Sequence, residues 1–170
     1  LRRAGSGPPV LLLHRDIGVP SGLPFYDALA GRFTVLAPSH PGYDGSERPE
    51  WLRSPRDVAV VYQRLIALLG ISDVSVIGLG FGGWIAASFA LRFPERVDRL
   101  VLVDAAGIDV GATDIPIDLN VSTRRAMREA FEFMFHDKAF ASDALVDLAY
   151  ALHLERGDGF VVPRSGNRRS

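Results

Sequence analysis

Residues 73–83 read D-V-S-V-I-G-L-G-F-G-G and are followed by the apolar stretch W-I-A-A-S-F-A-L at 84–91. The β-branched residues at 74–77 predict a buried strand, and the dense glycines after them predict a tight turn. The alanine-rich stretch predicts a helix over 84–93 that ends before Pro94. The rest of the chain must therefore fit around a strand, a glycine turn and a helix.

The glycines of this turn fit two different motifs. Gly78, Gly80 and Gly83 satisfy G-x-G-x-x-G, the dinucleotide-binding pattern, and Asp104 lies about where that pattern needs a ribose-binding carboxylate. Gly78, Gly80 and Gly82 also fit G-x-S-x-G, the nucleophile elbow, except that glycine stands at the serine position. Both motifs need glycine, because a residue without Cβ permits a tight turn and a close approach at the helix N-terminus.

Composition and charge exclude several classes of protein. The chain has 170 residues, 48% of them hydrophobic, which predicts one domain with one core. The net charge of −1 gives no basic surface for nucleic acid, and the basic cluster at 164–169 is expected to be a solvated tail. The absence of cysteine excludes disulfides, thiolate metal sites and a cysteine nucleophile.

Two features concern the location and completeness of the chain. No apolar run approaches the roughly 20 residues that span a bilayer, and no signal peptide opens the chain, so we expect a cytoplasmic protein. The chain begins at Leu1 rather than at methionine. We therefore expect it to be a piece of a longer protein.

Strands and helices alternate through the first two thirds of the chain. Strands are predicted at 10–14, 33–37, 74–77 and 99–103, and helices at 25–32, 55–69 and 84–93. The helix at 55–69 has an apolar stripe that is expected to face the core, formed by Val58, Val61, Leu65, Leu68 and Leu69. This alternation predicts an α/β fold with a mostly parallel central sheet between two layers of helices. After Gly107 the pattern changes to two helices, at 122–135 and 142–155, which indicates an insertion or lid.

Three segments around the glycine turn carry a family resemblance. They are P-V-L-L-L-H at 9–14, V-L-A-P-S-H-P-G-Y-D-G-S-E-R-P at 35–49, and A-L-R-F-P-E-R-V-D-R-L-V-L-V-D-A-A-G at 90–107. They resemble the strands and loops around the elbow in the α/β-hydrolase family, which includes lid-bearing esterases, lipases and dehalogenases. A dinucleotide-binding domain usually carries its glycines in its first strand–helix unit, whereas two strands and two helices precede them here. A dinucleotide-binding protein is therefore a minor alternative, and the resemblance implies no cofactor and no metal.

The resemblance also implies a division of the chain. Residues 1–107 resemble the N-terminal part of the hydrolase core, residues 108–156 a helical lid, and residues 157–170 an acid-bearing loop with a C-terminal tail. Residues 1–9, L-R-R-A-G-S-G-P-P, resemble the end of a β-hairpin whose first strand is absent. We therefore expect a partial sheet with an exposed hydrophobic edge through which chains self-associate.

The resemblance assigns roles to several residues. In the family, a serine at the elbow attacks an acyl carbon, a late histidine takes its proton, and an acid orients that histidine. Gly80 occupies the serine position and provides no nucleophile. E-R-G-D-G-F-V-V-P-R-S at 155–165 resembles the acid segment and makes Asp158 the candidate acid, with Asp104 as the alternative. No catalytic histidine is identified, and a structural role is expected for each of the four histidines, His14, His40, His136 and His153.

The oxyanion hole is expected beside the elbow. One donor should be the N–H of Phe81, and the other should come from the loop after the strand at 10–14, near Asp16. In that loop Arg15 follows His14 and replaces a family glycine. The carboxylate of Asp16 would repel a developing oxyanion if it pointed inward, and Arg15 is positioned in the sequence to neutralise it.

Two functions fit these residues. The first is a hydrolase of small acyl or related substrates, by resemblance, whose chemistry in this chain is lost or does not use a covalent serine. The second is a noncatalytic protein that binds a small apolar ligand or a partner under its two-helix lid. Neither function involves nucleic acid or a membrane span.

Overall fold

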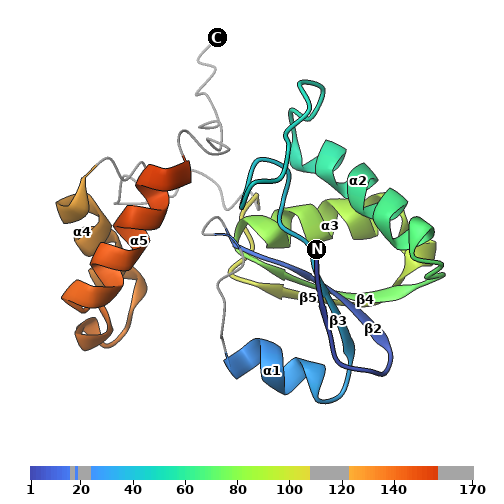
Figure 1. Cartoon of the computed structure of the whole chain (residues 1–170), viewed down its shortest axis with the longest axis horizontal. Coiled ribbons are helices and arrows are strands. Elements are labelled where there is room, and N and C mark those ends of the chain that lie inside the picture. The colour runs from blue at the N-terminus through green and yellow to red at the C-terminus, as the bar shows by residue number, and fades with distance from the viewer. Residues whose placement is uncertain (16–17, 19–23, 108–122, 157–170) are drawn as a thin grey trace, which may run out of the picture. The chain divides into compact units, whose positions relative to one another are not determined.

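The computed structural model describes residues 1–15, 18, 24–107 and 123–156 (Figure 1). The chain divides into two compact units, Leu1–Val110 and Gly111–Ser170. None of the helices in the described ranges combines the length and the hydrophobicity of a bilayer span.

The first unit is built on a five-stranded sheet in the order β1-β3-β2-β4-β5. Four strands run parallel, β2 (Pro9–Leu13), β3 (Thr34–Ala37), β4 (Val74–Leu79) and β5 (Val97–Val103), while β1 (Arg2–Ala4) pairs antiparallel with β3. The predicted mostly parallel sheet is therefore confirmed. Because β4 lies between β2 and β5, the glycine turn leaves the sheet from an interior strand.

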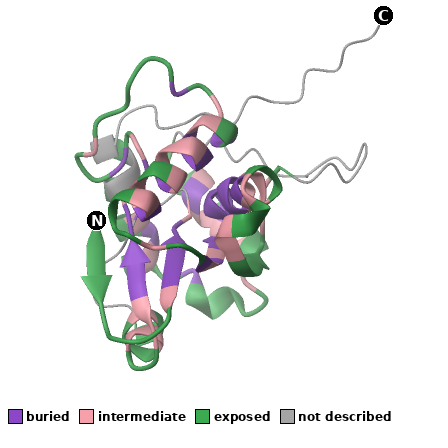
Figure 2. Ribbon diagram, turned by 90° about the vertical axis from the view of Figure 1, so that its right-hand side faces the viewer, coloured by how far each residue is buried: buried purple, intermediate pink, exposed green. Residues whose placement is uncertain are grey.

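Helices lie on both faces of this sheet. Figure 1 shows α2 (Pro55–Leu68) and α3 (Phe81–Arg92) on one side and α1 (Pro24–Ala30) on the other. The inner strands β2 and β3 are mostly buried (Figure 2), and Leu11, Leu12 and Leu13 of β2 are fully so, whereas β1 is exposed. The predicted three-layer arrangement is confirmed. Between α3 and β5 the chain makes a short 3₁₀ turn, η1 (Pro94–Arg96).

The buried face of α2 differs from the predicted stripe. Its buried residues are Pro55, Val58, Ala59, Tyr62 and Ile66, whereas Leu68 is 69% exposed. The helix is thus turned so that a tyrosine enters the core in place of Val61 and Leu65. A hydrophobicity pattern undervalues tyrosine, because its ring is apolar but its hydroxyl needs a partner when it is buried.

The partner of the Tyr62 hydroxyl is the imidazole of His40, in the loop after β3. The backbone N–H of His40 donates to Nε2 of His14 at 2.9 Å, and His40 Nε2 donates to the His14 carbonyl at 2.9 Å. The Nδ1–H of His14 donates to the Arg15 carbonyl. Since a carbonyl only accepts, these contacts fix the neutral tautomer of His14 and place a proton on Nε2 of His40, which burial keeps neutral. The two rings stack with centroids 3.7 Å apart. This His14–His40–Tyr62 network ties the loops after β2 and β3 to α2.

The second unit is a pair of helices. α4 (Arg124–Met134) and α5 (Asp143–Arg156) are joined through a 3₁₀ turn, η2 (Lys138–Phe140), and they pack through the buried residues Met127, Ala130 and Val146. The two predicted helices are present in this unit. Their role as a lid stays a prediction.

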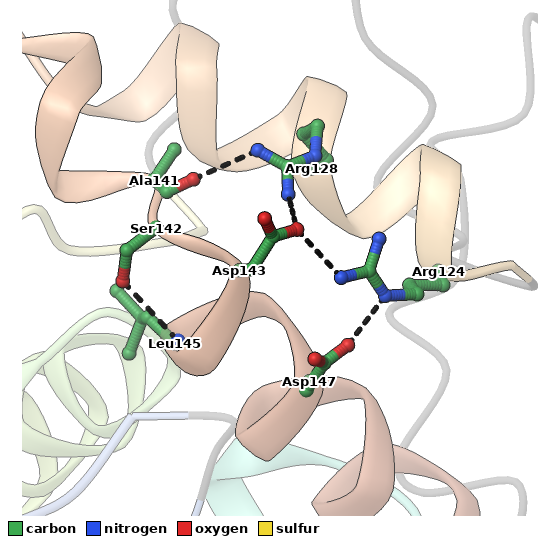
Figure 3. Close-up of polar contacts among 7 residues, drawn as sticks. All are labelled: Arg124, Arg128, Ala141, Ser142, Asp143, Leu145 and Asp147. Carbon is green, nitrogen blue, oxygen red and sulfur yellow. Dashed lines mark hydrogen bonds and ion pairs between the residues drawn. The ribbon is translucent and has the colours of Figure 1, made fainter.

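Ion pairs connect the two helices (Figure 3). The Arg124 guanidinium bonds to the carboxylates of Asp143, at 2.7 Å, and Asp147, and it holds the pKa of both carboxyls below the ordinary value. Arg128 pairs with the same Asp143 and donates to the Ala141 carbonyl at 3.0 Å. These side chains are largely exposed, so solvent weakens the pairs and they add little to the stability of the unit.

The β5 strand is exposed along most of its length. Leu100, Val101, Leu102 and Val103 are 40–47% exposed, and β4 is the strand neighbour of β5 in the described sheet. A long apolar edge with unpaired backbone groups is a template for pairing with another chain. In the described sheet, the hydrophobic edge is β5.

We expect the isolated chain to self-associate through β5. Val101→Lys should weaken this association, because a charged side chain on an edge strand opposes pairing. Light scattering over a range of concentrations measures the effect. The control is Leu91→Lys, which adds the same charge at an 85% exposed position of α3 and should leave association unchanged. A native chain that stays monomeric at high concentration would contradict the prediction.

We also expect acid to destabilise the first unit through His40. Burial, together with repulsion from His14, lowers the pKa of His40 from 6.5 to about 3, against the raising effect of its bond to the His14 backbone. Between these two pH values His40 is protonated in the unfolded chain but neutral in the folded chain. The free energy of unfolding therefore decreases as the pH falls below 6.5. The free energy of unfolding should be about 1.4 kcal/mol lower at pH 5.5 than at pH 7.5.

Urea denaturation at the two pH values tests this expectation. His40→Gln should lower the free energy of unfolding at neutral pH, because the Tyr62 hydroxyl loses its acceptor. The free energy of unfolding of this variant should change less between pH 7.5 and pH 5.5 than that of the native chain. His136→Gln, at an exposed position of the second unit, should keep the native dependence. If the free energy of unfolding changes with pH as much in His40→Gln as in the native chain, then protonation of His40 does not cause the change.

Candidate functional site

The glycine turn connects β4 to α3 through one residue, Gly80. Its backbone has φ 52° and ψ −115°, a conformation that favours glycine. Gly80 N–H donates to the Val103 carbonyl at 2.9 Å, and the Gly80 carbonyl accepts from Ala106 at 3.0 Å and from Gly83 at 2.9 Å. The turn is thus bonded to the loop after β5. α3 begins at Phe81, three residues before the predicted start. Gly82 and Gly83, predicted as part of the turn, lie in the first turn of this helix.

The other three glycines are packing positions. A Cβ on Gly78 would lie 2.5 Å from the Gly82 carbonyl oxygen, one on Gly82 would lie 2.3 Å from the Leu13 carbonyl oxygen, and one on Gly83 would lie 2.6 Å from Cβ of Ala105. Real Cβ atoms do not approach other atoms this closely. Glycine therefore lets α3 lie against its own strand, against the end of β2 and against the loop after β5. The space beside all three is filled by protein.

Gly80 faces a side chain instead of backbone. A Cβ at this position would lie 3.3 Å from Nε, 3.4 Å from Cγ and 3.7 Å from Cβ of Arg15. The Arg15 guanidinium also pairs with the Asp104 carboxylate at 3.9 Å, and the two side chains are 42% and 75% exposed. Asp104 itself has a positive φ of 48° at the end of β5. The structure thus brings together three residues that the sequence singled out separately, Gly80, Arg15 and Asp104.

The predicted oxyanion donor, Phe81, and the histidines His14 and His40 are all buried beside the turn. Phe81, the first residue of α3, is 5% exposed, and its ring meets the edge of the His40 ring with centroids 5.8 Å apart. His14 and His40 are each 1% exposed, and all four of their ring nitrogens take part in the network described above. Their contacts are those of structural residues.

Other predicted positions lie elsewhere. Asp16 and Asp158 fall outside the described residues, as does the side chain of His153. His136 is exposed in the second unit. In the described part of the chain, no three histidine, cysteine or carboxylate side chains gather as metal ligands would.

Two residues beside the site were not identified from the sequence. Tyr62 anchors His40, and the ring of Tyr43 lies edge-on to both His14 and His40, with centroids 5.2 and 5.9 Å away. The period of α2 offered a signal for Tyr62, since it lies four residues after Val58 and four before Ile66 on the buried face. No local pattern predicts the position of Tyr43.

Comparison with known proteins agrees with this geometry. The family model described as alpha/beta hydrolase fold matches residues 8–155. The chain is 32% identical to a 2-hydroxymuconate semialdehyde hydrolase from a Pseudomonas species over 168 residues, which are 92% of this chain and 58% of the relative. It is 41% identical to an uncharacterized protein of Mycobacterium tuberculosis over 109 residues, 63% of this chain and 32% of the relative.

A solved structure gives the same result. A mutant of the meta-cleavage product hydrolase CumD superimposes with a TM-score of 0.76 and 28% identity, over 96% of this chain and 65% of that one. The chain therefore spans less than two thirds of each of these three proteins. Together, the matched residues, the parallel sheet and the strand–glycine–helix turn show that this chain belongs to the α/β-hydrolase fold family.

Proposed function

We propose that this protein descends from hydrolases of small acyl or related substrates and that its elbow does not perform covalent serine catalysis. One observation carries the proposal: position 80 has no side chain, and its nearest neighbour there is the side chain of Arg15, 3.3 Å from where a Cβ would stand. An acyl-enzyme needs a nucleophilic atom on a side chain, and glycine has none. Covalent catalysis at position 80 is therefore impossible for this chain.

The substrate class is proposed from the relatives. The similar proteins named above are a 2-hydroxymuconate semialdehyde hydrolase and a meta-cleavage product hydrolase. A small organic molecule of related chemistry is therefore the ligand to test first. The exposed apolar side chains of the second unit support a role as a lid over such a ligand, and they are Phe133, Met134, Phe140, Leu148 and Leu154.

The second candidate function is binding without catalysis. It is favoured by the engagement of both buried histidines, because neither His14 nor His40 offers a nitrogen outside its network to act as a general base. Asp158 remains the proposed acid and Asp104 its alternative, but an acid orients a histidine and does not replace it. Measured binding of a substrate analogue with no turnover would support this second candidate.

We expect the native chain to show no serine-hydrolase chemistry. Turnover of p-nitrophenyl acetate should equal the rate in buffer, and a fluorophosphonate probe should leave no covalent label. Mass spectrometry of the labelled protein measures the second outcome directly. Stoichiometric labelling at any serine would contradict the proposal.

Gly80→Ser should not restore activity. The hydroxyl needs a base within about 3 Å, and such assistance typically contributes roughly 10²–10⁴-fold. The variant also places a side chain at a positive φ and next to Arg15, so a loss of stability is expected. Gly45→Ser is the matched control, since its φ is 75° and no atom lies within 4 Å of its Cβ position. Stoichiometric labelling of Gly80→Ser alone would reveal a working base.

We also expect no binding of NAD or NADP. In a dinucleotide site the glycines leave room for the pyrophosphate, whereas here the positions beside them are filled by protein atoms. Isothermal titration calorimetry measures the affinity. Micromolar binding that is lost in Asp104→Ala would favour the dinucleotide alternative.

A further inference from the structure

The side chain of Arg15 lies against the elbow along its length. Its Cβ, Cγ and Nε are 3.7, 3.4 and 3.3 Å from the position of a Cβ at Gly80. Contacts of 3.3–3.4 Å are at the short end of what real Cβ atoms show. A Cβ at position 80 would therefore touch Arg15, and Arg15 would have to shift by a few tenths of an ångström to admit it.

Two charged groups define the field at this position. The guanidinium of Arg15 brings a positive charge to Gly80, and the Asp104 carboxylate, 3.9 Å from that guanidinium, partly offsets it. Both side chains are partly exposed, so solvent weakens their pairing. In addition, α3 begins directly after Gly80, and its N-terminal amides add the same partial positive charge whatever stands at position 15.

We propose that Arg15 packs over the vacated nucleophile position, so that its side chain covers the elbow and gives position 80 a cationic environment. Arg15 and Gly80 are then a matched pair, because a residue without Cβ lets the Arg15 side chain lie closely against the turn. Arg15 has this role only in the noncovalent site proposed above, so the role rests on that function. Arg15 is a positioning residue and touches no known substrate.

An engineered thiol can report on both parts of the proposal. The chain contains no cysteine, so Gly80→Cys introduces a single thiol at the elbow. Its rate of alkylation by iodoacetamide, a neutral reagent, is measured as a function of pH. The midpoint of the profile gives the thiol pKa, and the plateau at high pH gives the accessibility of the thiolate.

Variants at positions 15 and 104 separate charge from volume. Arg15→Met keeps most of the volume and removes the charge, so the midpoint should rise by about one pH unit. Arg15→Ala removes both, so the plateau rate should also rise several-fold. Arg15→Lys should keep the low midpoint, and Asp104→Asn should lower it further. In Gly45→Cys, whose side chain points into open space at a similar φ, none of these changes should alter the profile.

Each outcome decides part of the proposal. If Arg15→Met leaves the thiol pKa unchanged, Arg15 does not give position 80 a cationic environment. If Arg15→Ala leaves the alkylation rate at high pH unchanged, the Arg15 side chain does not cover the elbow. If Gly80→Cys does not fold, the amide NMR signals of Gly80 and Phe81 in the Gly80-containing chain provide the test, since Arg15→Ala should shift them most. Signals that stay in place would overturn the proposal. These readouts are independent of fluorophosphonate labelling, so a failure here is distinct from a failure of the proposed function.

Discussion

The close approach of α3 to its surroundings is the constraint on which the first unit depends. Gly82 lies so near the Leu13 carbonyl, and Gly83 so near Ala105, that neither position has room for a Cβ atom. These two contacts join the elbow helix to the end of β2 and to the loop after β5. Since packed protein interiors do not absorb an extra methyl group without strain, α3 can keep this position only with glycine at both residues.

This constraint acts at other residues than the proposed vacated nucleophile position. The glycines at 78, 82 and 83 serve packing, whereas the space at position 80, the proposed nucleophile position, borders only the Arg15 side chain, so the packing of α3 does not depend on the residue at 80 in the same way. The positive φ at Gly80 carries no steric cost, because glycine has no Cβ. Fold and function are thus separable at neighbouring residues, which is why membership of the family does not establish an activity.

The His14–His40–Tyr62 network holds the loops beside the turn. A neutral pair of stacked imidazoles, each with a fixed tautomer, joins the ends of β2 and β3, and a tyrosine from α2 completes the bonding. Burial lowers the pKa of His40, so the ring is neutral in the folded network near neutral pH. The loop that carries Arg15 therefore leaves β2 from an anchored residue.

Local patterns determined the order of strands and helices, the place of the turn and the family, because a strand–turn–helix unit and its glycines are encoded within a few residues. The same patterns identified Gly80, Arg15 and Asp104 as residues of interest. Only the tertiary structure decided that Arg15 lies beside Gly80, that β1 pairs with β3, and that α2 turns Tyr62 rather than Leu65 into the core. These features depend on contacts between distant segments, and a periodicity cannot report which side chain meets which.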